Sequence, residues 1–289
     1  MIELHHNGYS ISEIRELIDS KESLELSQQL IANIKKGRSF LESFIERADS
    51  PIYGINTGFG SLCDTEIAPD DLGKLQENLV KSHACGLGDI VDPEIVKYML
   101  VLKVLGLSKG NSGVKLQTVE ALLDLYNSGV LPVVYEQGSL GASGDLAPLA
   151  HLSLPLLGLG EVHYNGEIVS AREALVVEGL SVIELSAKEG LALLNGTQFM
   201  SGYATYILGK LQKHVAHVDK VAALSLDAYD GRIEPFDDAV HAVRPHNGQR
   251  ETAAAMRLNL EGSDWVTQPK KHVQDPYSFR CIPQVHGAS

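Results

Sequence analysis

Gly141-Ala-Ser-Gly-Asp-Leu-Ala-Pro148 is the stretch that says most about this 289-residue chain. It places three small residues, Ala142, Ser143 and Gly144, in a row. Because glycine lacks a Cβ, the amide nitrogen of Gly144 can approach the carbonyl carbon of Ala142 in conformations closed to other residues. Attack by that nitrogen closes a five-membered ring. Loss of one water from the ring and one from Ser143 then leaves an exocyclic methylidene, an electrophile made from the chain itself.

The same stretch also fits an ordinary loop that enters a helix. In that interpretation Ser143 or Asp145 caps the helix, and Pro148 lies in its first turn. A nucleophile elbow is excluded because Asp145 stands where the G-x-S-x-G pattern requires glycine. The Gly-Lys-Ser/Thr of a phosphate loop is missing, and the glycine spacing from Gly138 onward differs from that of the dinucleotide fingerprint. Cyclisation and helix entry therefore both stay open on these residues alone.

The flanking residues extend this stretch into a longer motif. Gly138-Ser-Leu-Gly-Ala-Ser-Gly-Asp-Leu-Ala-Pro-Leu-Ala-His151 resembles the signature of the aromatic amino-acid ammonia-lyases and aminomutases. In that family Ala-Ser-Gly matures into 4-methylideneimidazol-5-one, abbreviated MIO. The resemblance implies that Ala142, Ser143 and Gly144 form an MIO cofactor, with no metal or nucleotide.

The composition argues against several classes of protein. The chain is 44% hydrophobic and 21% charged, which allows a substantial core in one large or two ordinary domains. A net charge of −13 argues against nucleic acid or an anionic membrane as a partner. There is no apolar run of about eighteen residues and no signal-peptide pattern at the N-terminus. The three cysteines lie far apart without a C-x-x-C pair, so we expect reduced thiols in a cytoplasmic protein without a zinc site.

Helical periodicity dominates the chain and predicts a mainly α fold. Four amphipathic segments are expected to be helices: 24–48, 70–85, 92–107 and 113–128. A minor β hairpin is expected over 161–170, where Asn165-Gly166 separates two short apolar stretches. A polar, turn-rich loop is expected over 229–249, followed by a helix near 250–260.

The segment 188–228 is long, apolar and almost free of helix breakers after Gly202, which predicts one extended helix of a central bundle. We therefore expect an N-terminal helical domain, residues 1–187, that carries the MIO stretch. Residues 188–289 would then form the first, incomplete part of the bundle. The resemblance implies the same fold, which is fumarase/aspartase-like, and a bundle that assembles into a homotetramer.

Tyr53-Gly-Ile-Asn-Thr-Gly-Phe-Gly60 is a glycine-punctuated loop that carries one phenol. Taken alone, it fits a surface turn with a packed tyrosine. The resemblance implies instead that Tyr53 lies on a mobile loop over the active site and removes the β-proton of the substrate. A free phenol has a pKa of about 10, so this role requires hydrogen-bond donors or positive charge nearby.

His83 follows Leu75 and Leu79 on one apolar stripe, which is typical of a buried core histidine. The resemblance implies that this position contacts the substrate side chain. Histidine-type members have a Ser-His pair here, as in Ser82-His83, whereas many tyrosine-type members have His-Leu and phenylalanine-type members Phe-Leu. A hydrogen-bonding His83 suits an imidazole or a phenol, and a phenyl ring would leave it unpaired.

Leu194-Asn-Gly-Thr-Gln198 fits an N-terminal helical turn capped by Asn195 or Thr197. The resemblance implies that Asn195 donates a hydrogen bond to the MIO ring oxygen, a role of the oxyanion-hole type. Gln198 after Asn-Gly-Thr is closer to the histidine-type members than to the plant phenylalanine type.

Gln274-Asp-Pro-Tyr-Ser-Phe-Arg280 is the last motif of the chain. Arg280 carries a planar fork that suits a carboxylate, and Tyr277 shares its face if the segment is helical. Such a pair also fits an ordinary exposed surface. The resemblance implies that Arg280 binds the substrate carboxylate and that Tyr277 helps to organise the MIO pocket.

The resemblance covers essentially the whole chain and implies non-oxidative elimination of ammonia from L-histidine to give trans-urocanate. L-Tyrosine as substrate and an aminomutase reaction stay open. Family chains continue well past the last motif and build each active site from three subunits, whereas this sequence stops at Ser289. We therefore expect a truncated form with impaired activity and altered assembly. A lyase-derived assembly module without catalysis is the second hypothesis.

Overall fold

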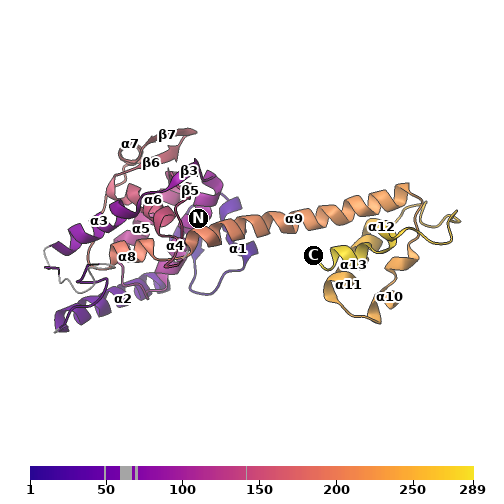
Figure 1. The fold of residues 1–289 in the computed structure, drawn as a ribbon, viewed down its shortest axis with the longest axis horizontal. Coiled ribbons are helices and arrows are strands. Elements are labelled where there is room, and N and C mark those ends of the chain that lie inside the picture. The colour runs from indigo at the N-terminus through magenta and orange to yellow at the C-terminus, as the bar shows by residue number, and fades with distance from the viewer. Residues whose placement is uncertain (49, 59–66, 69–70, 141) are drawn as a thin grey trace. The chain divides into compact units, whose positions relative to one another are not determined.

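The computed structural model describes residues 1–48, 50–58, 67–68, 71–140 and 142–289, and most of its elements are helices (Figure 1). The mainly α fold predicted from the sequence is confirmed. The chain divides into two compact units, residues 1–207 and 208–289, which are described separately. The sequence-based division into residues 1–187 and 188–289 stays a prediction.

Unit 1 is built around helix α4, Pro93–Ser108, which is buried on several sides and therefore apolar over most of its surface. Asp92 caps α4 by accepting a hydrogen bond from the amide of Glu94, and Pro93 occupies the first position. The other complete helices of unit 1 are α1 (Ile11–Asp19), α2 (Gln28–Arg47), α3 (Leu72–His83), α5 (Leu116–Asn127), α6 (Leu146–Ser153), α7 (Ala171–Val177) and α8 (Glu189–Leu194), with the 3-10 helix η3 at Leu154–Leu157.

Short strands form three small sheets at the margins of unit 1. Parallel strands β1 (Ile2–Leu4) and β2 (Leu24–Leu26) make the first, and antiparallel strands β3 (Leu87–Ile90) and β5 (Tyr135–Gln137) make the second. The third has the order β4 (Leu131–Pro132), β6 (Glu161–Tyr164) and β7 (Glu167–Ser170), and α7 packs on it at the top of Figure 1.

The expected hairpin over 161–170 is confirmed as β6 and β7, with Val162 opposite Val169. Asn165 and Gly166 connect the strands at φ values of 51° and 85°, the left-handed geometry that a tight two-residue hairpin turn requires. Four of the predicted helices are present as α2, α3, α4 and α5 with shifted ends. The prediction was wrong at 24–26, because these residues pair with β1 and Ser27 then caps α2 through the amide of Leu30.

The single helix predicted over 188–228 is interrupted. Helix α8 ends at Leu194 and α9 runs from Gln198 to Ala228, because the backbone of Asn195 is extended (φ −77°, ψ 116°). The apolar pattern continues through this break, so periodicity gave no sign of it. The loop expected over 229–249 also contains short helices, and α11 begins inside it at Asn247.

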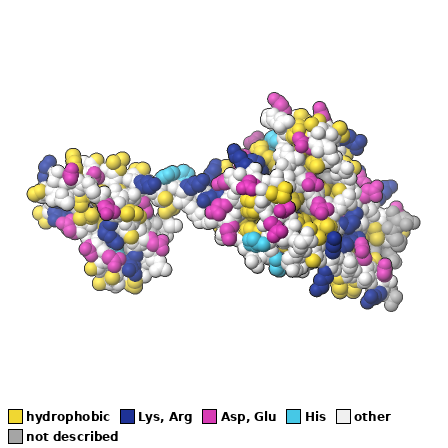
Figure 2. All heavy atoms as spheres, turned by 180° about the vertical axis from the view of Figure 1, so that it is seen from behind, with side chains coloured by type: hydrophobic (Ala, Val, Ile, Leu, Met, Phe, Trp, Pro, Cys, Tyr) yellow, Lys and Arg dark blue, Asp and Glu magenta, His cyan; other side chains and the backbone are white. Residues whose placement is uncertain are grey.

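Unit 2 consists of most of α9 and a small layer of short helices. These are η4 (Glu234–Phe236), α10 (Asp238–Ala242), α11 (Asn247–Asn259), α12 (Tyr277–Arg280) and α13 (Ile282–His286). Their core is small and centres on Phe236, Met256 and Ile282. The face drawn in Figure 2 shows acidic and basic side chains interspersed over each unit. Within the described residues, no helix has the length and apolarity needed to cross a bilayer.

Candidate active site

Asp145 connects the small-residue stretch to the start of α9. Its carboxylate is fully buried and accepts hydrogen bonds from the Ser139 hydroxyl at 2.8 Å and from the amide of Met200 at 3.0 Å. Its own amide donates to the carbonyl of Gly196 at 2.8 Å. Asp145 is the N-cap residue of α6 and Pro148 lies in the first turn of that helix, as the helix-entry interpretation predicted, but the Asp145 side chain makes no capping hydrogen bond.

Gly144 packs directly against the backbone of Gly196. Its φ of +108° is rarely adopted by residues with a side chain. A Cβ at Gly144 would lie 2.6 Å from the carbonyl oxygen of Gly196 and 2.8 Å from its nitrogen. Both the conformation and the space at this position therefore require glycine. Gly141, which begins the quoted stretch, lies outside the described residues.

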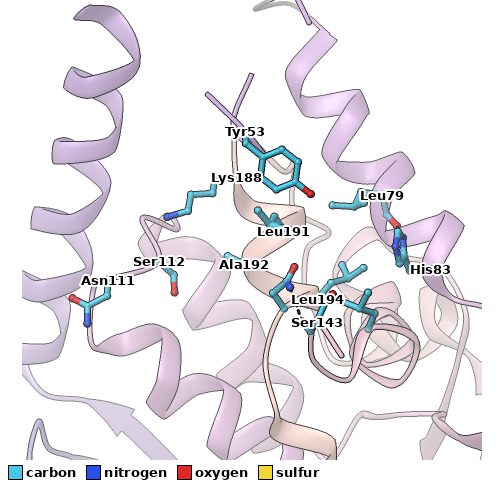
Figure 3. Close-up of a pocket in the computed structure, with 12 residues that line it drawn as sticks. Tyr53, Leu79, His83, Asn111, Ser112, Ser143, Lys188, Leu191, Ala192 and Leu194 are labelled. Carbon is cyan, nitrogen blue, oxygen red and sulfur yellow. Dashed lines mark hydrogen bonds between the residues drawn. The ribbon is translucent and has the colours of Figure 1, made fainter. Parts of the chain in front are cut away.

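Asn195 reaches the same stretch from the break between α8 and α9. Its Nδ2 donates a hydrogen bond of 2.7 Å to the carbonyl oxygen of Ser143, drawn as the dashed line in Figure 3. This oxygen is the one that would become the ring oxygen if the stretch cyclised. Ala142 and Ser143 are exposed, whereas Asp145 behind them is buried.

A pocket of about 620 Å³ opens above Ser143. Four residues singled out from the sequence line it: Tyr53, His83, Ser143 and Asn195. In Figure 3 the Tyr53 side chain enters from one end, and Ser143 lies at the other. The apolar part of the pocket wall includes Leu79, Leu146, Leu191 and Leu194. The side chain of Tyr53 is 59% exposed in this structure. Phe59 and Gly60 of its loop lie outside the described residues.

His83 ends α3 on the pocket wall beside Leu79. Its Nδ1 lies 2.9 Å from the carbonyl oxygen of Leu79 and 3.1 Å from the Ser82 hydroxyl. In the tautomer that donates from Nδ1 to this carbonyl, Nε2 carries a lone pair and accepts hydrogen bonds. The apolar stripe thus directs His83 to a half-exposed site at the pocket instead of into the core.

Sequence reasoning missed three polar residues of the pocket: Asn111, Ser112 and Lys188. Figure 3 shows them opposite His83. Asn111 and Ser112 lie between Gly110 and Gly113, whose positive φ values form a tight loop. Lys188 adopts φ +71°, which costs a non-glycine residue on the order of 1 kcal/mol. The glycine pair around Asn-Ser was the signal that could have found the first two.

Glu189 anchors α8 and so positions the pocket floor. Its fully buried carboxylate accepts from the Thr118 hydroxyl at 2.5 Å, the amide of Lys115 at 2.8 Å and the amide of Ser186 at 2.9 Å. Burial raises the pKa of this carboxyl, but these hydrogen bonds and the Lys115 charge outweigh burial and hold the pKa below its usual value. Glu189 is therefore an ionised structural group.

Tyr277 and Arg280 belong to unit 2, whereas the lining residues of the pocket all belong to unit 1. They share one face of α12, where the guanidinium carbon of Arg280 lies 4.2 Å from the centre of the Tyr277 ring. With the Gln274 amide turned so that its oxygen faces Arg280, that oxygen accepts a hydrogen bond of 2.6 Å from Nη2. Tyr277 is 70% exposed.

Residues 9–289 match the family described as aromatic amino acid lyase. The chain belongs to this family. It is 45% identical over 290 residues to histidine ammonia-lyase 2 of Fusobacterium nucleatum subsp. nucleatum, a match that covers all of this chain and 57% of that protein. Histidine ammonia-lyase of Streptococcus gordonii is 46% identical over 269 residues, with coverage of 92% and 52%. The chain thus spans a little over half the length of these members of the lyase family.

A solved structure of the lyase family is also similar to this chain over about half of its own length. Histidine ammonia-lyase from Trypanosoma cruzi superposes with a TM-score of 0.87 at 35% identity, over 99% of this chain and 54% of that one. Across the described residues, no group of three or more His, Cys, Asp or Glu side chains is arranged to hold a metal ion.

Proposed function

We propose that Ala142, Ser143 and Gly144 form MIO and that the chain acts in the elimination of ammonia from L-histidine to give trans-urocanate. The observation that carries this proposal is the hydrogen bond from Asn195 to the Ser143 carbonyl, next to the glycine contact at Gly144 and Gly196. The 45% identity to a histidine ammonia-lyase supports the choice of substrate.

Cyclisation uses only atoms of the chain. The Gly144 nitrogen bonds to the Ala142 carbonyl carbon, whose oxygen leaves as water with the amide protons of Ser143 and Gly144. The Ser143 hydroxyl leaves as a second water with the Cα proton of the same residue. Asn195 stabilises the negative charge that the Ser143 oxygen carries when the Cα proton leaves in the second step, and it stays hydrogen-bonded to this oxygen afterwards. MIO supplies an electrophilic methylidene carbon for the substrate amine.

Tyr53 is the proposed base of the reaction. Its side chain enters the pocket opposite Ser143, so a substrate placed between them would present its β-carbon to the phenol oxygen. Lys188 lines the same pocket.

His83 is the proposed contact of the substrate side chain. With Nδ1 donating to Leu79, Nε2 can accept the N–H of an imidazole. A phenol would satisfy the same acceptor, so L-tyrosine is the closest competitor. Replacement of His83 by Phe is expected to lower turnover of L-histidine by at least about tenfold relative to L-phenylalanine. Rates with both amino acids measure this ratio.

Arg280 is proposed to bind the substrate carboxylate, and Tyr277 is proposed to help organise the MIO pocket. Their stacked arrangement and the contact with Gln274 hold the guanidinium fork in one orientation. We further propose a cytoplasmic homotetramer. Support comes from exposed apolar residues at heptad-like spacing on α9: Leu208, Leu211, Val215 and Val218.

Intact mass and turnover test the proposal together. The wild-type chain should be two waters lighter than its sequence and should produce urocanate absorbance from L-histidine. Tyr53→Phe should keep the mass loss and lose turnover, because it removes the base and leaves the small-residue stretch unchanged. Ser143→Ala should lose both. An unshifted wild-type mass would contradict MIO formation and favour an assembly module.

A further inference from the structure

Lys103 is a buried cation that the proposed chemistry does not use. It is the one charged side chain among the buried residues of α4 and is 2% exposed. Burial lowers the pKa of its ammonium from 10.5 to about 7. Burying a charge costs free energy unless partners in the protein compensate for the lost water. The partners of Lys103 therefore indicate what this lysine does.

The Lys103 ammonium is directed at the first residue of α9. Its Nζ lies 3.5 Å from Oε1 of Gln198. The same amide packs against the Gly196 backbone, since a Cβ at Gly196 would lie only 2.1 Å from Oε1. On its other side, Nε2 of Gln198 would lie 3.5 Å from a Cβ at Gly106, one turn after Lys103. The Gln198 side chain is therefore held between α4 and Gly196.

Gly196 in turn contacts the residues that would cyclise. Its carbonyl accepts the amide hydrogen of Asp145, and its backbone leaves no room for a Cβ on Gly144. A continuous series of contacts thus runs from Lys103 through Gln198 and Gly196 to Gly144. No substrate group is needed to complete it.

We propose that Lys103 is a positioning residue for cyclisation of Ala142-Ser143-Gly144, acting through the Gln198 side chain and the Gly196 backbone. This inference rests on the proposed formation of MIO. Ring closure requires the Gly144 nitrogen to be held near the Ala142 carbonyl carbon, and such pre-orientation accelerates intramolecular reactions by large factors. The ammonium fixes the amide that supports Gly196, and Gly196 limits the space open to Gly144.

A purely structural lysine predicts a different outcome for its replacement. Methionine fills a similar volume without a charge, so Lys103→Met removes the desolvation cost and should leave the fold at least as stable as the wild type. If Lys103 only filled space, this variant would cyclise completely. If Lys103 positions the stretch, the variant is folded but largely uncyclised.

The test is the fraction of each purified protein that is two waters lighter by intact mass, measured beside its thermal unfolding. We expect Lys103→Met and Gln198→Met each to lower this fraction several-fold, and Lys103→Arg to restore most of it. The double variant Lys103→Met with Gln198→Met should retain about the same cyclised fraction as the single variant with the lower fraction, because both changes interrupt one series of contacts. Lys97→Met, the same substitution at a partly exposed position of α4, is the matched control and should cyclise like the wild type.

A folded Lys103→Met protein that cyclises as completely as the wild type would overturn the inference and leave the proposed function standing. A wild-type chain without the mass loss would overturn the proposed function itself. If Lys103→Met does not fold, Gln198→Met decides: incomplete cyclisation supports the series of contacts, and complete cyclisation overturns it.

Discussion

The two units differ in how they use their apolar residues. Unit 1 surrounds α4 with an extensive core and builds its pocket on that frame. Unit 2 has a small core, whereas Leu211 and Val218 on α9 stay exposed. Unit 1 therefore holds its reactive stretch by internal contacts, and unit 2 exposes apolar surface of the kind that association buries. We therefore expect the proposed cyclisation to depend on contacts within unit 1, and the proposed self-association to depend on the exposed apolar face of α9.

The largest expected effect concerns unit 1 and tests its contact between Gly144 and Gly196. Gly144→Ala should abolish the two-water mass loss, because its Cβ would meet the Gly196 backbone at a φ that alanine avoids. Gly8→Ala is the control, since no described atom lies within 4 Å of a Cβ there. Intact mass reads both. A Gly144→Ala protein with the full mass loss would refute the role assigned to this glycine contact.

The next effect is on the pH dependence of stability and comes from Lys103. Its pKa is about 7 when folded and near 10.5 when unfolded, so between these values the unfolded chain binds more protons. The unfolding free energy of the wild type should therefore rise as the pH increases from 7 towards 10.5, by up to about 5 kcal/mol. Lys103→Met should lack this rise. Denaturant unfolding of both proteins at pH 6.5, 8 and 9.5 measures this difference. If the unfolding free energies of the two proteins change equally with pH, the lowered pKa of Lys103 is contradicted.

A smaller effect concerns unit 2 and tests whether the exposed apolar residues of α9 mediate self-association. Leu211→Lys together with Val218→Lys should raise the dissociation constant of self-association by about tenfold or more, since each apolar side chain contributes about 1.5–3 kcal/mol when buried. Light scattering after size exclusion measures the assembly. Lys213→Gln, an exposed change on the same helix, should leave it unaffected. The idea fails if the wild type is monomeric, or if the double variant assembles normally.

The smallest effect concerns His151 in unit 1. Its Nε2 accepts the amide hydrogen of Gly86 at 3.0 Å, and burial lowers its pKa from 6.5. As the pH falls below 6.5, the unfolded chain takes up a proton before the folded one, so the free energy of unfolding falls. His151→Gln should lose part of this acid sensitivity, whereas exposed His217→Gln should keep it. Thermal unfolding at pH 7 and pH 5 provides the comparison.

Short-range sequence patterns correctly predicted the elements that are determined by residues close together in the chain. The Asn165-Gly166 turn and the amphipathic helices are of this kind. The family resemblance, and not a local pattern, singled out Tyr53, His83 and Asn195, which line the pocket beside Ser143. The sequence did not predict β2, because its pairing with β1 is a contact distant in sequence. The apolar periodicity likewise gave no sign of the break at Asn195, although the Leu194–Gln198 motif fitted the start of a helix there. The Asn195 side chain bonds Ser143, 52 positions away, and this contact takes the place of a helical turn.

The contact between Gly144 and Gly196 has a consequence for how such a site can diversify. It is made of backbone atoms, so it is closed to any side chain of its own. The pocket wall at Leu79, His83 and Asn111 is made of side chains and can vary one residue at a time. New substrate preferences can therefore arise by single substitutions in the wall without rebuilding the reactive stretch.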